Sequence, residues 1–202
     1  MKRFLRNTRY FFFAVAILAL GYSAYVLLDA RLFQAYQTWR FQQALTAAPP
    51  PPAVAEASRT RAENLALGGG EGASLGRIEI NAVGLAAMIL EGTESGTLRR
   101  AVGHVPGTAL PGQQGNVAIA GHRDTFFRGL RKIQNGDEIT LTTLNGVSRY
   151  LVNSTQVVEP SDIKVLDNST DAILTLVTCY PFDFVGPAPK RFIVRAHKVP
   201  LG

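Results

Sequence analysis

The sequence predicts an all-β domain that follows a single apolar helix near the N-terminus. Three observations support this prediction. Short β-branched or alternating segments separated by turn residues dominate the C-terminal part, helical periodicity is scarce there, and an uncharged apolar stretch lies near the start of the chain. Many short strands without long helices are typical of an antiparallel barrel or sandwich.

The N-terminal stretch has the composition of a membrane-spanning segment. Residues 1–9 are basic, and residues 10–28 carry no charge. As a helix rising about 1.5 Å per residue, residues 10–28 span roughly 28 Å, close to the thickness of a bilayer core. The basic residues predict a cytoplasmic N-terminus and an extracytoplasmic remainder, with residues 10–28 as a transmembrane signal anchor. A cleaved signal peptide is the alternative, but its apolar region is shorter and Gly21–Ala24 is a poor cleavage site.

Residues 29–75 predict a juxtamembrane helix and a linker. Residues 31–45 contain Tyr, Trp and Arg at mixed helical spacing, which is typical of a helix that leaves the membrane through the headgroup region. From Ala47 to Ser74 the chain is rich in Pro, Ala and Gly and too poor in large apolar residues to order itself. Residues 76–202 are long enough for one compact domain with its own core.

The net charge of +6 arises mostly outside this domain. Residues 1–75 hold 8 Lys and Arg against 4 Asp and Glu, whereas residues 76–202 hold 13 against 11. The domain also lacks a basic run interleaved with aromatic residues. This composition does not support a nucleic-acid partner.

The strands of the domain are predicted from alternation and β-branched composition. They are Arg77–Ile80, Ala86–Leu90, Val117–Ala120, Glu138–Leu144, Val147–Val158, Ile173–Val177 and Arg191–Ala196. Asn145-Gly146 separates two alternating runs and predicts a β-hairpin with a type I′ turn. Residues 125–133 and 160–166 predict only short helices.

Cys179 is the only cysteine and the first candidate for chemistry. It closes an apolar run and precedes Tyr180-Pro181, and because proline cannot donate to a ladder the strand is expected to end there. A lone thiol cannot form an internal disulfide, and in an extracytoplasmic domain the odd count favours a reactive group. A buried small hydrophobe is the alternative.

A catalytic thiol needs a base nearby, and the chain has three histidines. His122 follows an apolar strand that breaks at Gly121, His104 lies in the turn-like residues 103–107, and His197 lies near the C-terminus. His122 is therefore the best candidate, because a strand end holds a side chain more rigidly than a loop. Neither histidines nor carboxylates have metal-ligand spacing, so no metal or other cofactor is expected.

Acyl transfer also needs hydrogen-bond donors for the developing oxyanion. Arg191 and Arg195 flank an apolar trio in the last predicted strand. Alternation places both on one face of that strand, so the spacing does not choose between them.

Three segments together resemble the sortases, the cysteine transpeptidases that anchor proteins at bacterial surfaces. Thr175-Leu176-Val177-Thr178-Cys179 resembles the TLxTC signature of that family, Gly115 to Arg123 resembles the block around its histidine, and Lys190 to Val194 is similar to the block that holds its arginine. The segments follow the family's order across residues 76–202. Tyr180-Pro181 and the short Leu110 to Gly112 region are most similar to class D sortases.

This resemblance implies a sortase-type eight-stranded β-barrel with short helices, preceded by the N-terminal transmembrane helix. Cys179 would attack the threonine carbonyl of a Leu-Pro-x-Thr-Gly-like sorting signal and form a thioacyl enzyme. His122 would act as acid and then base, and Arg191 would bind the peptide and stabilise the oxyanion, together with Thr178. The implied partners are proteins with a C-terminal sorting signal, an amine acceptor (a peptidoglycan precursor or a surface protein), and the membrane.

Two alternatives to transpeptidation stay open at the level of the sequence. In the first, water is the acyl acceptor and the protein is a hydrolase. In the second, the domain is a non-catalytic barrel that binds peptide or wall polymer, although the presence of all three candidate catalytic residues argues against it.

Overall fold

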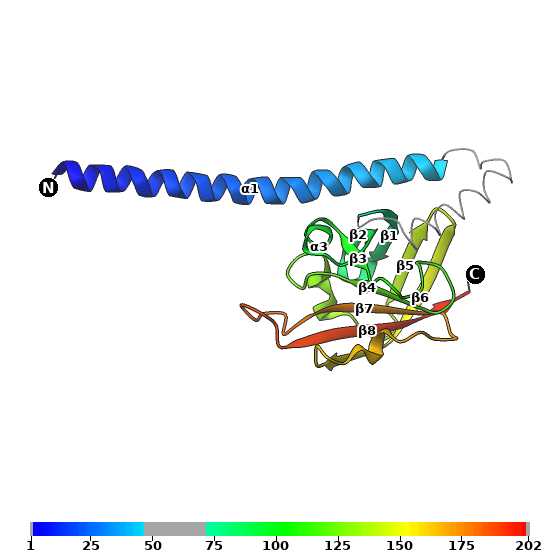
Figure 1. Cartoon of the computed structure of the whole chain (residues 1–202). Helices are drawn as coiled ribbons and strands as arrows, with labels where there is room; N and C mark the ends of the chain where they lie inside the picture. Colours follow the sequence, from blue (N-terminus) through cyan, green and yellow to red (C-terminus); the bar gives the residue numbers. More distant parts are fainter. Residues whose placement is uncertain (1, 47–71, 201–202) are drawn as a thin grey trace.

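The computed structural model describes residues 2–46 and 72–200 (Figure 1). Residues 47–71, most of the predicted linker, lie outside the described residues. The long elements are helix α1 (Lys2–Thr46) and strands β1 (Ser74–Ile80), β2 (Leu85–Glu91), β3 (Val102–His104), β4 (Asn116–Ala120), β5 (Glu138–Thr143), β6 (Gly146–Val158), β7 (Ile173–Tyr180) and β8 (Lys190–Val199). The short helices are η1 (Asn81–Val83), α3 (Ser95–Arg100), η2 (Phe126–Lys132) and η3 (Ile163–Leu166).

The strands close into a barrel in the order β1-β2-β3-β4-β7-β8-β6-β5, which confirms the predicted all-β fold. Neighbouring strands are antiparallel except β2 with β3 and β4 with β7. A parallel pair needs a long crossover connection. Between β4 and β7 that connection contains β5 and β6, so two segments far apart in the sequence become neighbours.

The core fills the barrel with residues that alternate along each strand. On β4, Val117 and Ile119 point inward, and on β7 Leu174 and Leu176 do the same. Helix η2 adds Phe127, which is fully buried among them. Each such side chain contributes roughly 1.5–3 kcal/mol through burial. The core therefore fixes which residues of β4 and β7 are left to face outward.

Strand β3 and helix α3 were not predicted. The stretch around His104 was expected to be turn-like, but residues 102–104 form a strand between β2 and β4. Because it has ladder partners on both sides, β3 is stable despite its length of 3 residues. His104 is only 2% exposed as a result.

The β5–β6 hairpin is confirmed, but the predicted type I′ turn is wrong. Thr143 pairs with Gly146, so Leu144 and Asn145 form the loop. A type I′ turn needs positive φ at both loop residues, and among the described residues only glycines have positive φ, including Gly146 at 129°. The Thr143 hydroxyl accepts the Asn145 N–H and donates to the Gly146 carbonyl, each at 3.2 Å, which stabilises this earlier turn.

Helix α1 joins the predicted span and the predicted juxtamembrane helix without a break. Among the described residues it is the one helix long and apolar enough to cross a membrane, judged by length and composition. Its C-terminal half packs against the barrel, where Asp29 pairs with Arg100 at 2.9 Å and Phe41 is 8% exposed. Gln34 donates to the Arg100 carbonyl at 2.7 Å and accepts the Met88 N–H at 3.0 Å.

Strand β1 begins at Ser74, two residues before the predicted start of the domain at Gly76. Ser74 pairs with Leu90, and the Ala73 carbonyl accepts the Glu91 N–H at 2.8 Å. The barrel therefore includes the end of the segment that was predicted as linker.

Candidate active site

The parallel pairing of β4 with β7 brings His122 and Cys179 together. The last ladder pair is Ala120 with Val177, and His122 and Cys179 each follow two residues later in the chain. Two hydrogen bonds show that the pairing continues past the end of β4. The Gly121 N–H donates to the Val177 carbonyl at 3.1 Å, and the Thr178 hydroxyl donates to the Gly121 carbonyl at 2.7 Å. Because neighbouring strands are about 4.8 Å apart, we expect the imidazole and the thiol to lie at the same end of this strand pair.

On the other side of Cys179, the antiparallel pairing of β7 with β8 places Arg191 directly opposite. Arg195 instead pairs with Thr175, four residues further along, or roughly 13 Å at about 3.3 Å per residue. The register thus separates the two arginines that the sequence left equivalent. Cys179 on β7 and Arg191 on β8 thus lie opposite each other, and His122 follows the end of β4, on the other side of β7. These three residues are called the row below.

The row lies on the outer face of the barrel. Because Leu174 and Leu176 point inward, alternation turns Thr178 inward and Cys179 outward. Cys179 is half-buried, whereas Thr178 is 2% exposed. Since the Thr178 hydroxyl donates its proton to Gly121, its side chain holds the segment that leads to His122 and does not point into the row.

The reactive atoms of the row are available for a ligand. Within residues 2–46 and 72–200, neither the His122 ring nor the Cys179 thiol makes a hydrogen bond. Nη1 of Arg191 donates to the carbonyls of Ala188 and Lys190 at 3.2 and 3.0 Å, which leaves its Nε and Nη2 without partners in the described chain. A thiol beside an imidazole and a guanidinium is the arrangement that nucleophilic catalysis by cysteine requires.

Gly121 lets the chain turn tightly before His122. A Cβ at this position would lie 2.7 Å from Cδ2 and 2.9 Å from Cγ of Phe127. Because Phe127 is fully buried in the core, its ring cannot move away cheaply. The glycine therefore allows the backbone to pass directly over η2 and present the imidazole beside the thiol.

Sequence reasoning missed Arg123, which follows His122 directly. Its guanidinium donates to three carbonyls of the β7–β8 connection (residues 181–189): Pro181 at 2.9 Å, Phe184 at 2.6 Å and Gly186 at 3.0 Å. Arg131 adds an ion pair with Asp183. The segment after the histidine thus holds the segment after the cysteine strand. No sequence signal reveals this, because the acceptors are backbone groups distant in the chain.

The outer face of the pair is also tied together at the start of β4. Asn116 accepts the hydroxyl proton of Thr175 at 2.7 Å, and its amide donates to the carbonyls of Val165 and Asp167 at 3.1 and 3.0 Å. The β6–β7 connection is thereby held over the outer face of β4. The row around Cys179 lies at the other end of the same two strands.

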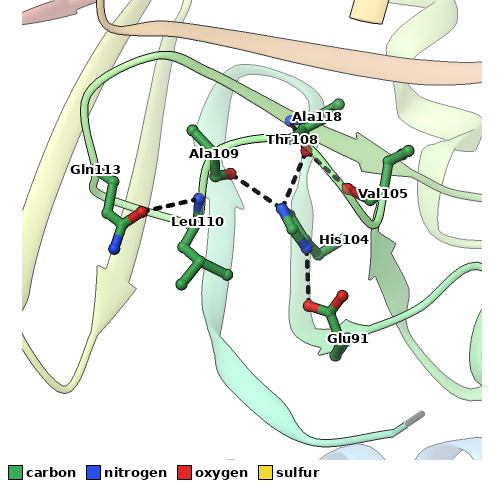
Figure 2. Close-up of polar contacts among 8 residues, drawn as sticks. All are labelled: Glu91, His104, Val105, Thr108, Ala109, Leu110, Gln113 and Ala118. Atoms are coloured by element: carbon green, nitrogen blue, oxygen red, sulfur yellow. Dashed lines mark hydrogen bonds and ion pairs between the residues drawn. The ribbon is translucent and has the colours of Figure 1, made fainter. Parts of the chain in front are cut away.

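His104 is not part of this row. As Figure 2 shows, its Nδ1 lies 2.8 Å from Oε2 of Glu91, and its Nε2 lies 3.0 Å from the Ala109 carbonyl and 3.1 Å from Oγ1 of Thr108. Both ring nitrogens are therefore bound inside the protein, which indicates a structural role.

His197 is likewise remote from the thiol. It pairs with Ile173, at the opposite end of β7 from Cys179. Of the three histidines, only His122 is brought to the thiol by the fold.

Comparison with known proteins identifies the family of this barrel. The sequence model of the sortase domain matches residues 78–199. Sortase D of Bacillus subtilis (strain 168) is 30% identical over 191 residues, which cover 94% of this chain and 96% of that protein. Sortase A of Listeria monocytogenes is 31% identical over 125 residues, 60% of this chain and 54% of that protein.

Solved structures agree. A sortase D5 transpeptidase from Clostridium perfringens matches with a TM-score of 0.67 at 28% identity, covering 85% of this chain and 99% of that chain. Sortase C from Clostridium perfringens SM101 matches with a TM-score of 0.60 at 30% identity, covering 71% and 85%. These matches confirm the resemblance on which the eight-stranded barrel was predicted.

Proposed function

The chain belongs to the sortase family of cysteine transpeptidases, and on that premise we propose that Cys179 cleaves a Leu-Pro-x-Thr-Gly-like sorting signal and passes the protein to an amine. The observation that supports the proposal is that Cys179 lies opposite Arg191, while His122 follows the end of β4, the strand that pairs with β7 on its other side. The proposed nucleophile, acid–base group and cation come from three separate parts of the sequence.

In the first half of the proposed reaction, the Cys179 thiolate attacks the carbonyl carbon of the threonine. The carbon–nitrogen bond to the following glycine breaks, and the His122 imidazolium donates its proton to the departing amine. The product of this half is a thioester between Cys179 and the sorting signal. The amine-terminated fragment leaves with the proton it received.

In the second half, an incoming amine attacks the thioester. His122, now neutral, accepts the proton that the amine loses, and the thiolate of Cys179 departs. The enzyme returns to its starting protonation state with a new amide bond formed. With water in place of the amine the same steps give hydrolysis, and the ratio of the two products with and without added amine distinguishes the outcomes.

Arg191 is proposed to stabilise the oxyanion of both tetrahedral intermediates. Its Nε and Nη2 carry hydrogens that no described residue accepts, and its strand position lies opposite Cys179. Thr178 was expected to stabilise the oxyanion together with Arg191, but its hydroxyl donates to the Gly121 carbonyl, so we propose that it instead holds the segment that leads to His122.

We further propose that residues 10–28 anchor the enzyme in a membrane, with residues 1–9 in the cytoplasm and the barrel outside. The support is the apolar α1 segment, whose described side chains are exposed, and the basic residues before it. The partners are then proteins that carry a sorting signal and an amine acceptor at the cell surface.

The test uses the full chain in detergent micelles with a library of fluorogenic sorting-signal peptides. The wild type is expected to cleave a subset of the library, and Cys179→Ala is expected to cleave none. Mass spectrometry of the wild type mixed with a good substrate should show the mass of the acyl adduct, and Cys179→Ala is the matched control. Inactivity of the wild type on every peptide, with a thiol that reacts normally with an aromatic disulfide, would contradict the proposal.

A further inference from the structure

Helix α1 begins its contact with the barrel at the end that carries the active site. Asp29 pairs with Arg100, the last residue of α3. Strand β3 starts two residues later, and its Gly103 pairs with Ala120, two residues before His122. The contact between Asp29 and Arg100 therefore lies near the level of the catalytic row.

The later contacts of α1 lie progressively toward the opposite end. Phe41 and Gln42 line a groove together with Thr142, next to the β5–β6 hairpin. Strand β6 connects the two ends of the barrel. It starts at the hairpin, and its last residue, Val158, pairs with Arg191 of the catalytic row. The hairpin and the row thus lie at opposite ends of the barrel. The N-terminal half of α1 extends beyond the barrel on the side where β7 connects to β8 (Figure 1).

This direction fixes what the active-site end faces if α1 is a membrane anchor. The apolar segment ends at Leu28, and the next residue, Asp29, makes the first ion pair with the barrel. At about 1.5 Å per residue, the docked part of the helix starts within one turn of the apolar segment. The barrel is therefore held next to the bilayer, with its active-site end turned toward it.

The most exposed apolar side chain of the barrel lies at this same end. Val185, in the β7–β8 connection, is 94% exposed, and Phe184 beside it is 45% exposed. Figure 1 shows this connection on the side of the barrel toward the N-terminal half of α1. The connection is held in shape by Arg123, so the two apolar side chains are presented by a fixed loop.

Basic residues accompany these apolar ones. Arg128 and Lys132 of η2 are exposed at the active-site end, and neither forms an ion pair with any residue of the described chain. Each basic side chain near an anionic bilayer contributes about 1 kcal/mol of attraction. An apolar loop tip flanked by unpaired basic side chains is suited to a headgroup region.

We propose that the end of the barrel that carries Cys179 faces the lipid bilayer, with Phe184 and Val185 in contact with its headgroup region. This rests on the proposed membrane anchoring.

The experiment compares three labelled positions in the full chain. In a Cys179→Ala background, which removes the native thiol, single cysteines at Val185, Leu144 and Leu18 are labelled with an environment-sensitive NBD fluorophore. The proteins are reconstituted in vesicles of phosphatidylcholine and phosphatidylglycerol. All three side chains are exposed in the structure, so the labels leave the core intact. Leu144 is the matched control, because it lies on the hairpin at the far end of the barrel.

The expected result is a blue-shifted emission at positions 18 and 185 and several-fold weaker quenching by iodide than at position 144. Equal quenching at positions 185 and 144, with position 18 shielded, overturns the orientation while the anchoring stands. Full quenching at position 18 overturns the anchoring and the orientation with it.

A second variant tests the docking of α1. Gln34→Ala together with Arg100→Ala removes the hydrogen bonds that Gln34 makes to α3 and β2 and that Asp29 makes to Arg100. Iodide quenching at position 185 is then expected to rise toward the value at position 144, while position 18 stays shielded. Unchanged shielding at position 185 in this variant would show that docking of α1 does not set the orientation, and would overturn the argument made from it.

Discussion

His122 and His104 belong to neighbouring segments of one barrel, yet their rings meet opposite conditions. The ring of His104 is 2% exposed and bound at both nitrogens, to Glu91 and to the 108–109 turn. The ring of His122 is half-buried and makes no hydrogen bond within the described chain. The comparison shows that the partners of an imidazole, more than its place on a strand, decide whether it can exchange a proton with a ligand.

The hydrogen bonds around His104 also define where its protons lie. The Ala109 carbonyl can only accept, so Nε2 of His104 carries a hydrogen. The Thr108 hydroxyl donates to the Val105 carbonyl at 2.8 Å and so acts as a second acceptor for Nε2. Nδ1 lies 2.8 Å from the Glu91 carboxyl group. Both ring nitrogens are thus held by partners inside the protein.

The largest effect on turnover is expected at His122, the candidate catalytic histidine of this comparison. His122→Ala should lower turnover by roughly 10²–10⁴, the usual contribution of a general acid–base group. Its free energy of unfolding should change by no more than about 0.5 kcal/mol, because the ring makes no hydrogen bond in the described chain. Peptide cleavage and urea unfolding measure the two quantities. A loss of stability as large as the loss of activity would contradict the assignment.

The next effect distinguishes the two arginines. Arg191→Ala should lower turnover by roughly 10²–10³, the cost of removing one oxyanion donor. Arg195→Ala is the matched control, since it removes the same side chain four positions away, opposite Thr175. Equal losses in the two variants would show that the row does not include Arg191.

The structural side of the comparison is tested at His104. His104→Ala leaves the Glu91 carboxylate buried without its partner, which should cost about 3–5 kcal/mol of unfolding free energy. Activity per folded molecule should stay near the wild-type value. Glu91→Gln is the control, because its amide can donate to Nδ1 and the loss should be smaller. If His104→Ala lowers turnover of the folded enzyme as strongly as His122→Ala, the comparison fails.

A smaller effect is expected at Arg123, which holds the β7–β8 connection. Arg123→Ala should lower kcat/KM by roughly tenfold, about the value of one charge-assisted hydrogen bond. The loss should fall mainly on KM, because Arg123 holds the connection that follows Cys179 and has no proposed part in the proton transfers. Arg123→Lys should not restore the activity, since an ammonium cannot reach three carbonyls in the same way. Arg128→Ala, at an exposed residue of η2, is the control and should have no such effect.

The smallest effect concerns Tyr150, a buried polar group without the partners that His104 has. Its hydroxyl has no hydrogen-bond partner among residues 2–46 and 72–200, and burial raises its pKa from 10.0 to about 12. The unfolded chain therefore loses this proton first as the pH rises. Stability should be unaffected below pH 10 and should fall between pH 10 and 12 by up to about 1.4 kcal/mol per pH unit.

Tyr150→Phe isolates this contribution from other alkaline titrations. The variant should be as stable as the wild type at pH 7 or more stable by about 1 kcal/mol, because it removes an unpaired buried hydroxyl. Its stability should fall less between pH 10 and 12, as measured by urea unfolding at each pH. Parallel curves for the two proteins would show that the hydroxyl finds a partner in solution.

Strands whose alternation reflects one buried face were predictable from the sequence. Strand β5 ends at Thr143, where Leu144 was predicted, and β7 ends at Tyr180, where the alternating run was predicted to end at Val177. The proline after Tyr180 ends β7 as predicted. Residues 102–104 were not, because so short a strand has no periodicity of its own and is stabilised only by pairing with β2 and β4. The hairpin turn lies one residue earlier than predicted, because the Thr143 hydroxyl forms hydrogen bonds with the Asn145 N–H and the Gly146 carbonyl of the loop.

The candidate site was predictable as residue types but not as an arrangement. A lone thiol at a strand end and a histidine after a glycine could be selected locally. Their proximity depends on a parallel pairing across a connection of more than fifty residues, and the choice between Arg191 and Arg195 depends on the register of β7 with β8. The hydrogen bonds from Arg123 to the β7–β8 connection use backbone carbonyls that only the folded chain brings together. The docking of α1 on the barrel likewise depends on groups that are far apart in the sequence.

The parallel register of β4 with β7 has a consequence for how errors in folding would be felt. Side chains alternate between the two faces of a strand, so a slip of one residue would turn Cys179 into the barrel and leave His122 outside. Such a molecule would have no residual catalysis, however compact it was. The hydrogen bond from the Thr178 hydroxyl to the Gly121 carbonyl forms only in the correct register. It therefore stabilises the one pairing of β4 with β7 in which Cys179 faces outward.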